Sequence, residues 1–194
     1  MQGGRRLSTH AKESAAEQRG IKLPGRDEAL RLLKDAGADD SVIAHCKAVS
    51  ALALKIAGRC KKPVDSNLIE IAGLLHDIGR ASTHGIAHGV EGAKIAKDLG
   101  LPVDVIKIIE RHIGAGLTEK DAVRLGLPKK SYMPETIEEK IIAHADNLLS
   151  GAKRIPVSET ISKLVRMQEM EGAKRMLALH KELSDLCGID LDQL

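Results

Sequence analysis

The feature that most constrains the fold is a long succession of helical patterns separated by short breaks. From Pro24 onward, aliphatic residues recur at three- and four-residue spacings, the periodicity of a helix with one apolar face. Glycine, proline or both interrupt these patterns near residues 37, 61–63, 79–85, 100–102, 114–116 and 126–134. No segment shows a convincing strand pattern, so the sequence predicts an all-α protein of about eight or nine helices.

The composition fits a compact helical bundle. The 194 residues are 43% hydrophobic with no Trp, no Phe and one Tyr, so Leu, Ile, Val and Ala must build the core. Such aliphatic side chains suit helix-on-helix packing. We expect one helical domain over residues 21–194, with a motif-bearing core at 40–155 and covering helices at 156–190. The polar residues 1–20 are expected to form a flexible or weakly ordered segment.

Charge and cysteine usage exclude several classes of protein. The formal net charge of +3 is too small to predict a dedicated nucleic-acid surface, but it is compatible with a phosphorylated small molecule. Cys46, Cys60 and Cys187 are odd in number and widely spaced, which argues against a disulfide framework or a zinc ribbon. No apolar run reaches the roughly 20 residues of a membrane span, and the N-terminus lacks a signal-peptide pattern. We therefore expect a cytoplasmic protein without a membrane partner.

Six titratable residues fall on faces that the predicted helices should bury. The adjacent His76 and Asp77 lie in the apolar run 72–80, where an imidazole and a carboxylate are costly unless hydrogen-bonded or coordinated. Four more residues continue apolar stripes on other predicted helices: His45, His88, His112 and Asp146. One buried histidine is most often a hydrogen-bonded core residue. Six such groups together predict a shared metal centre.

Four imidazoles and two carboxylates form a ligand set for divalent metals, among which the sequence leaves Fe, Mn, Ni, Co, Zn and Mg open. Neighbouring helical residues are splayed by about 100°, so His76 and Asp77 serve one centre best near a helix end, which Gly79 offers. A carboxylate can also bridge two ions. We expect a divalent metal cofactor, with two ions and Asp77 as the bridge.

The order of these residues and the segments around them resemble the HD-domain superfamily of metal-dependent phosphohydrolases. The resemblance covers about residues 40–155 and rests on the segments LLHDIGR, HGVEGAKIAKDLG, RHIGAG and AHADNLLSG. It is greatest to small stand-alone HD hydrolases, including bacterial dinucleoside-polyphosphate hydrolases and uncharacterised archaeal proteins. It implies that one metal ion is held by His45, His76, Asp77 and Asp146, and a second by Asp77, His88 and His112.

The resemblance also implies an activity, the hydrolysis of a phosphoester or phosphoanhydride in a nucleotide-like small molecule. A metal-activated bridging hydroxide would attack phosphorus, with Asp77 as the bridging ligand. His84, in the loop before His88, would contact substrate or donate a proton, unless it is only an exposed loop residue. Four basic residues are candidates for substrate binding, although a solvated surface charge is the more common role for any one of them: Arg80, Lys94, Lys153 and Arg154. Among these, Lys153 and Arg154 are the strongest candidates, because the related hydrolases carry a basic residue shortly after their last metal aspartate.

The sequence leaves two other functions open. The same ligand set occurs in di-iron oxygenases on the HD scaffold, and a catalytically silent module would bind a nucleotide or use its metal only to brace helices. The helices after Pro156 either cover the bundle or form a homodimer contact. His144 is two residues from Asp146 and points away from it on a helix, so we exclude it as a ligand. His10 and His180 lie far from the motif and carry no role.

Overall fold

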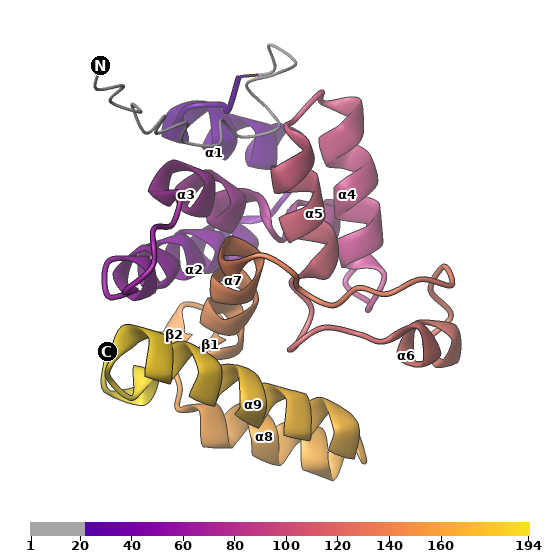
Figure 1. The fold of residues 1–194 in the computed structure, drawn as a ribbon. Helices are drawn as coiled ribbons and strands as arrows, with labels where there is room; N and C mark the ends of the chain where they lie inside the picture. Colours follow the sequence, from indigo (N-terminus) through magenta and orange to yellow (C-terminus); the bar gives the residue numbers. More distant parts are fainter. Residues whose placement is uncertain (1–21) are drawn as a thin grey trace, which may run out of the picture.

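The computed structural model describes residues 22–194, and Figure 1 shows that their fold is helical. These residues form nine α-helices: α1 (Arg26–Asp35), α2 (Asp40–Ala57), α3 (Ser66–Leu75), α4 (His88–Asp98), α5 (Val103–Arg111), α6 (Glu119–Arg124), α7 (Ile137–Asn147), α8 (Val157–Arg166) and α9 (Met170–Cys187). Two 3₁₀ helices, η2 (Ile78–Ala81) and η3 (Leu191–Gln193), and a hairpin of β1 (Leu149–Ser150) with β2 (Lys153–Arg154) complete the fold.

The predicted all-α class and number of helices are confirmed within the described residues. The hairpin was not predicted, because strands of two residues are too short to show an alternating pattern. The predicted flexible segment at 1–20, with His10, lies outside the described residues, and the domain bounds stay a prediction. Within residues 22–194, none of the helices combines the length and the apolarity that crossing a bilayer needs.

Helix α3 forms the centre of the bundle and packs against α1, α2, α5 and α7. Its first two residues are polar and exposed, whereas the last five residues, 71–75, are apolar and all buried. Gly73 lets α2 approach closely, because a Cβ there would lie 2.8 Å from the Cα of Ser50. Asp65 caps the start of α3 by accepting a hydrogen bond from the Leu68 N–H. The C-terminal end of α3 therefore lies in the middle of the molecule.

The turn after α3 carries the His76-Asp77 pair. The helix ends at Leu75, so it stops before the expected end at Gly79. Gly79 has a different role: a Cβ there would clash with the backbone of His88 and Gly92. The glycine thus allows η2 to lie directly against the first turn of α4, which brings His88 next to the pair.

The C-terminal helices α8 and α9 pack together beside α7 (Figure 1). Met176, Leu179 and Leu183 of α9 are buried in the same apolar cluster as residues of α2 and α7. These helices therefore cover the bundle, the first of the two predicted arrangements. A homodimer contact stays a prediction.

Candidate metal centre

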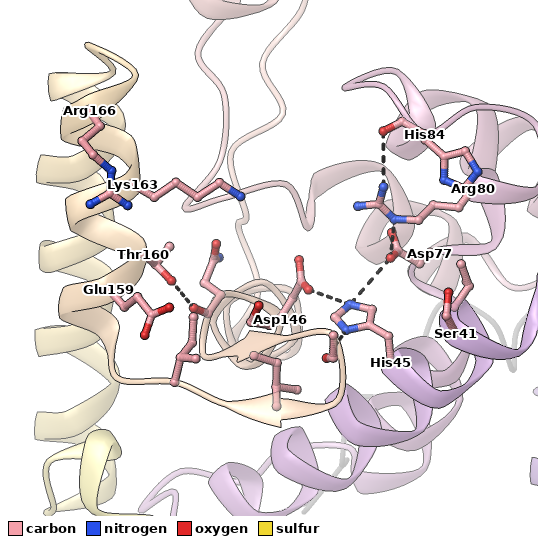
Figure 2. Close-up of a pocket in the computed structure, with 16 residues that line it drawn as sticks. Ser41, His45, Asp77, Arg80, His84, Asp146, Glu159, Thr160, Lys163 and Arg166 are labelled. Atoms are coloured by element: carbon pink, nitrogen blue, oxygen red, sulfur yellow. Dashed lines mark hydrogen bonds and ion pairs between the residues drawn. The ribbon is translucent and has the colours of Figure 1, made fainter.

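The structure brings the six predicted metal ligands together. His45 comes from α2, His76 and Asp77 from the turn after α3, His88 from the first turn of α4, His112 from the end of α5, and Asp146 from α7. His45, Asp77 and Asp146 also border a cavity of about 530 Å³, shown in Figure 2, and the three other histidines lie deeper. The centre is thus an internal cluster with one open side.

Asp77 lies between two groups of imidazoles and is 1% exposed. Its Oδ1 is 3.1 Å from the Nε2 of His88 and 3.5 Å from the Nε2 of His112. Its Oδ2 is 3.6 Å from the Nε2 of His45 and 3.8 Å from the Nε2 of His76. The two oxygens of one carboxylate therefore face different histidines, which is the arrangement a bridging ligand needs.

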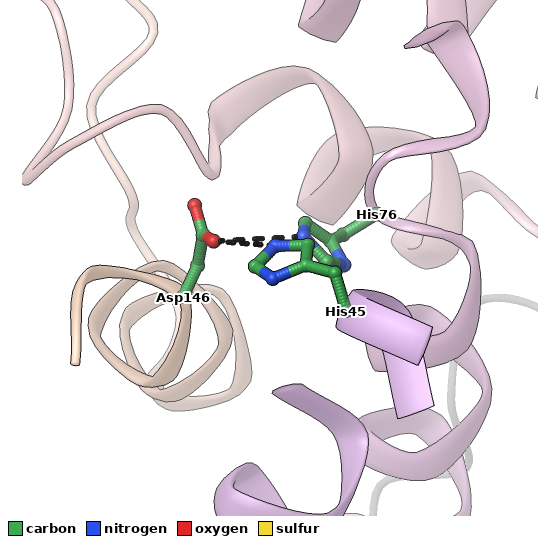
Figure 3. A group of neighbouring side chains, drawn as sticks. All are labelled: His45, His76 and Asp146. Carbon is green, nitrogen blue, oxygen red and sulfur yellow. Dashed lines mark ion pairs between the residues drawn. The ribbon is translucent and has the colours of Figure 1, made fainter. Parts of the chain in front are cut away.

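Asp146 faces the first of these groups from α7 (Figure 3). Its Oδ1 lies 2.9 Å from the Nε2 of His45 and 3.8 Å from the Nε2 of His76. One ligand atom from each of His45, His76 and Asp146 lies within 4.8 Å of the others, and the same holds for His76, Asp77 and His112. Separations of this size allow several atoms to contact one ion placed between them.

Backbone carbonyl groups fix the orientation of all four imidazoles. Each Nδ1 lies 2.7–2.8 Å from a carbonyl oxygen: Gly151 for His45, Gly73 for His76, Gly85 for His88 and Ile109 for His112. Because a carbonyl oxygen only accepts, each Nδ1 must carry the proton, and the Nε2 of a neutral ring points its lone pair at the centre. Metal-bound histidines are commonly oriented in this way.

The centre consequently gathers acceptor atoms without enough donors. The Nε2 atoms of His88 and His112 face each other at 3.0 Å. The Nε2 of His76 and the Oδ1 of Asp77 are buried without a hydrogen bond from the described residues. Either extra protons or a cation must lie among these atoms. Six nitrogen and oxygen ligands around a buried space fit a divalent cation.

Electrostatics favour the same conclusion. Burial would raise the pKa of Asp77, but the surrounding imidazoles, His76 foremost, hold it well below its usual range. Burial likewise opposes ionisation of Asp146, and the adjacent rings of His45 and His76 outweigh it, so this pKa is also lowered. Burial disfavours the charged His112 ring and lowers its pKa. Burial opposes protonation of His45 and His76 too, but the neighbouring carboxylates, Asp146 and Asp77 respectively, outweigh it and raise both pKa values. The two ionised carboxylates therefore require positive charge beside them, supplied either by protons on these rings or by a metal ion.

Two residues predicted to contact substrate lie at the mouth of this centre. The Nε of Arg80 donates a 2.6 Å hydrogen bond to the Oδ2 of Asp77, and its Nη1 donates to the backbone oxygen of His84 at 3.3 Å. Both residues line the cavity, as Figure 2 shows.

Three other predicted substrate contacts do not line the cavity. Lys94 is exposed on α4 and pairs with Glu91 at 2.8 Å, and Lys153 is exposed on β2. Arg154 donates to the backbone oxygens of Leu148, Ile155 and Leu191 at 2.6–3.0 Å, so it fastens η3 to the hairpin. The prediction placed these side chains by their distance along the chain from Asp146 or His88. Lys153 and Arg154 lie in the hairpin and Lys94 lies on the exposed face of α4, so none of the three borders the cavity.

The sequence prediction missed a wall of the cavity that α8 forms. Glu159, Thr160, Lys163 and Arg166 all line the cavity and follow one face of this helix. The sequence spacing does show that these residues share one helical face, but nothing in the sequence indicates that α8 lies opposite the proposed metal centre. The segment was therefore predicted only to cover the bundle or to form a homodimer contact.

His144 and His180 form a second buried group of histidines away from the centre. The Nε2 of His144 is 3.0 Å from the Nδ1 of His180, and the Nε2 of His180 is 3.1 Å from a carboxylate oxygen of Asp190. His144 therefore faces α9, in agreement with its exclusion as a ligand. His180 was predicted to have no role, yet it connects α7 to the C-terminal segment.

Comparison with known proteins identifies the family. Residues 42–151 match the family described as HD domain, which is more than half of the chain. This chain therefore belongs to the HD domain family, the family of metal-dependent phosphohydrolases that its motifs resemble. The solved structure of the PgpH phosphodiesterase HD domain of L. monocytogenes, in complex with cyclic-di-AMP, shares the fold. Its TM-score is 0.50 and its identity 18%, over 82% of this chain and 95% of that one.

Two relatives match most of this chain. An uncharacterized protein of Methanocaldococcus jannaschii, MJ0778, is 45% identical over 165 residues, 82% of this chain and 97% of that protein. A tRNA (cytidine(56)-2'-O)-methyltransferase of Picrophilus torridus is 43% identical over 172 residues, which are 89% of this chain and 50% of the relative. The chain thus spans about half the length of the methyltransferase that it matches.

Proposed function

We propose that this protein is a metal-dependent phosphohydrolase that cleaves a phosphoester or phosphoanhydride bond in a nucleotide-like substrate. The observation that carries the proposal is the centre of inward-facing acceptor atoms, which opens through Asp77 and Asp146 into a cavity. The cavity volume of about 530 Å³ lies within the range of small-molecule sites. The related PgpH domain was solved with cyclic-di-AMP, which supports a nucleotide-like ligand.

The ligand set divides between two ions. His45, His76, Asp77 and Asp146 would hold one divalent ion, and Asp77, His88 and His112 would hold a second. When bound, such ions activate water for attack on phosphorus and neutralise charge on the phosphoryl oxygens. A set with four imidazoles favours Mn, Fe, Co, Ni or Zn over Mg, which prefers oxygen ligands.

The residues at the mouth of the centre complete the reaction. Hydrolysis adds a water oxygen to phosphorus and breaks one P–O bond, and the departing oxygen takes up a proton. We assign the donation of that proton to His84, whose ring lines the cavity beside Arg80. Arg80 acts as a positioning residue, because its hydrogen bond to Asp77 fixes the orientation of that carboxylate.

Activity assays with defined metals test the proposal. The purified protein, loaded in turn with Mn, Ni, Co or Mg, is offered nucleotides, cyclic nucleotides and dinucleoside polyphosphates in nitrogen-purged buffer. We expect metal-dependent release of phosphate or of a nucleotide. Such release without oxygen also excludes the oxygenase as the main activity. Failure of every metal to bind, or of every substrate to react, would contradict the proposal.

Substitution of the proposed proton donor gives a second test. We expect His84→Gln to lower kcat by about a hundredfold, the usual effect of removing a general acid. The metal content should not change, because His84 is not a ligand. Lys94→Gln, which alters an exposed cation outside the cavity, should leave kcat and KM unchanged. Equal kcat values for His84→Gln and the unaltered protein would remove His84 from the mechanism.

A further inference from the structure

The wall that faces the metal centre carries positive charge. Lys163 and Arg166 of α8 line the same cavity as Asp77 and Asp146. Figure 2 shows α8 on one side of this space and His45, Asp77 and Arg80 on the other. Helix α8 begins at Val157, beyond the residues 42–151 that match the HD domain. The cationic wall is thus a feature of this chain outside the matched core.

Both cations are free to bind a ligand. Within residues 22–194, neither Lys163 nor Arg166 forms an ion pair, whereas Arg124, for example, pairs with Glu169 at 2.6 Å. Glu159 lies four residues before Lys163, a spacing at which a helical glutamate normally attracts a lysine. Figure 2 shows that Lys163 instead extends into the cavity. Its ammonium group is available there to an anion.

Long-range contacts hold the wall in place. The Thr160 hydroxyl donates a 2.6 Å hydrogen bond to the backbone oxygen of Asn147, one residue after Asp146. The backbone N–H of Val157 donates to Asp192 at 2.9 Å. On the inner side of α8, Val157, Ile161 and Leu164 belong to or pack against the main apolar cluster. Lys163 and Arg166 therefore lie on a helix, α8, that is hydrogen-bonded directly to α7, the helix that carries Asp146.

We propose that Lys163 and Arg166 bind a second phosphate group of the substrate, distinct from the phosphate that reacts at the metal centre. This inference rests on the proposed function, which places the reacting phosphate beside Asp77. An ammonium and a guanidinium group together are suited to a phosphate, which accepts charge-assisted hydrogen bonds from both. The apolar side chains of Val42, Leu149 and Ile155 line the same cavity and offer contacts to a nucleoside. The substrate class is therefore a nucleotide with two separate phosphate groups.

Binding of matched probes tests this inference without requiring turnover. The probes are the slowly hydrolysed phosphorothioate analogues of adenosine 5'-monophosphate and adenosine 3',5'-bisphosphate, titrated calorimetrically into the manganese-loaded protein. We expect the bisphosphate analogue to bind at least about tenfold more tightly, a modest effect for a second charge-assisted contact. The double variant Lys163→Gln/Arg166→Gln should lose this preference and keep its affinity for the monophosphate analogue and its metal content.

The double variant Lys94→Gln/Lys153→Gln is the matched control, because it removes the same amount of charge outside the cavity. It should retain the preference for the bisphosphate. Equal affinity of the unaltered protein for both probes, or a preference that survives in Lys163→Gln/Arg166→Gln, would overturn the inference. Neither result depends on hydrolysis, so failure of the second phosphate site is distinguishable from failure of the proposed phosphohydrolase activity.

Discussion

The protein buries two groups of histidines, and they differ in what their ring nitrogens face. At the metal centre, four Nδ1 atoms donate to carbonyl oxygens and four Nε2 atoms converge on acceptors. In the second group, His180 donates through Nε2 to Asp190 and accepts through Nδ1 from the Nε2 of His144. Donors and acceptors alternate there, and only the Nδ1 of His144 has no partner among the described residues.

This difference separates the proposed metal ligands from a structural histidine better than burial does. His76 and His144 are both fully buried, on neighbouring helical segments of one core. His180, Asp190 and Asp192 even bring their ligand atoms within 4.8 Å of one another. Yet Asp190 accepts from the N–H of Asp192, and Asp192 from the N–H of Val157. Apart from the Nδ1 of His144, the polar atoms of the second group therefore have partners within the described residues, and its carboxylates do not require a cation.

The largest expected contrast concerns activity. Asp77→Asn removes the charge of the proposed bridging ligand. We expect hydrolysis to fall at least about a hundredfold and the proposed ions to be lost, because even changes to indirect partners of metal ligands cost 10–100-fold. His144→Gln should keep its metal and its activity, since its Nε2 can still donate to His180. Metal content by elemental analysis, measured with kcat on the same samples, checks both variants. Metal loss in His144→Gln would contradict the proposal that only the first group of histidines binds metal.

Chelation should reveal the same contrast in stability. A ligand at a thousand times its Kd stabilises a protein by about 4 kcal/mol, which corresponds to a melting temperature on the order of 10 °C higher in a chain of this size. We expect EDTA to lower the melting temperature of the unaltered protein and of His144→Gln by that amount. Asp77→Asn should show almost no response. An equal response of all three proteins would mean that the cation binds elsewhere.

Gly79→Ala should damage the centre through the backbone. A Cβ there clashes with the backbone of His88 and Gly92, so η2 and α4 must separate. We expect a loss of about 1–3 kcal/mol in the free energy of unfolding and weaker binding of the ion assigned to His88 and His112. Gly25→Ala, where a Cβ meets nothing within 4 Å, is the control. Denaturant unfolding and metal titration measure the two effects, and a Gly79→Ala protein that behaves like the control would refute the close-packing explanation.

The smallest expected effect is a pH dependence in the second group. Burial, together with the charges of His180 and Arg154, lowers the pKa of His144 to about 3. An unfolded histidine titrates near 6.5, so between these values the unfolded chain binds a proton that the folded protein excludes, and stability falls as the pH drops. Going from pH 7.5 to 5 in EDTA, the unaltered protein should lose on the order of 2 kcal/mol more than His144→Gln. Parallel stability curves would show that His144 is not held neutral.

The sequence was sufficient to predict the helices and the gathering of six titratable side chains in the interior, because both follow from local patterns of apolar residues. His45, His88, His112 and Asp146 continue apolar stripes, and a stripe of a helix must face the core. The end of α3 was placed too late, since Gly79 serves a tertiary contact with α4 and not a helix cap.

The basic side chains that border the cavity could not be predicted in the same way. Lys163 and Arg166 reach the cavity only because Thr160 and Val157 fasten α8 to Asn147 and Asp192, contacts that join residues 13 and 35 positions apart. Arg154 points away from the cavity because it lies in a hairpin whose strands, of two residues each, leave no periodic signal in the sequence. Exposed cations have no burial requirement, so their direction is set by packing that sequence spacing does not encode.

Anomalous diffraction at the manganese absorption edge, from crystals of the manganese-loaded protein, tests the central claim most directly. We predict two peaks that share Asp77, one contacted by His45, His76 and Asp146 and the other by His88 and His112. We predict no peak at His180, Asp190 and Asp192, whose polar atoms already hydrogen-bond to one another. A manganese ion at that second group, or a centre without any peak, would contradict these predictions.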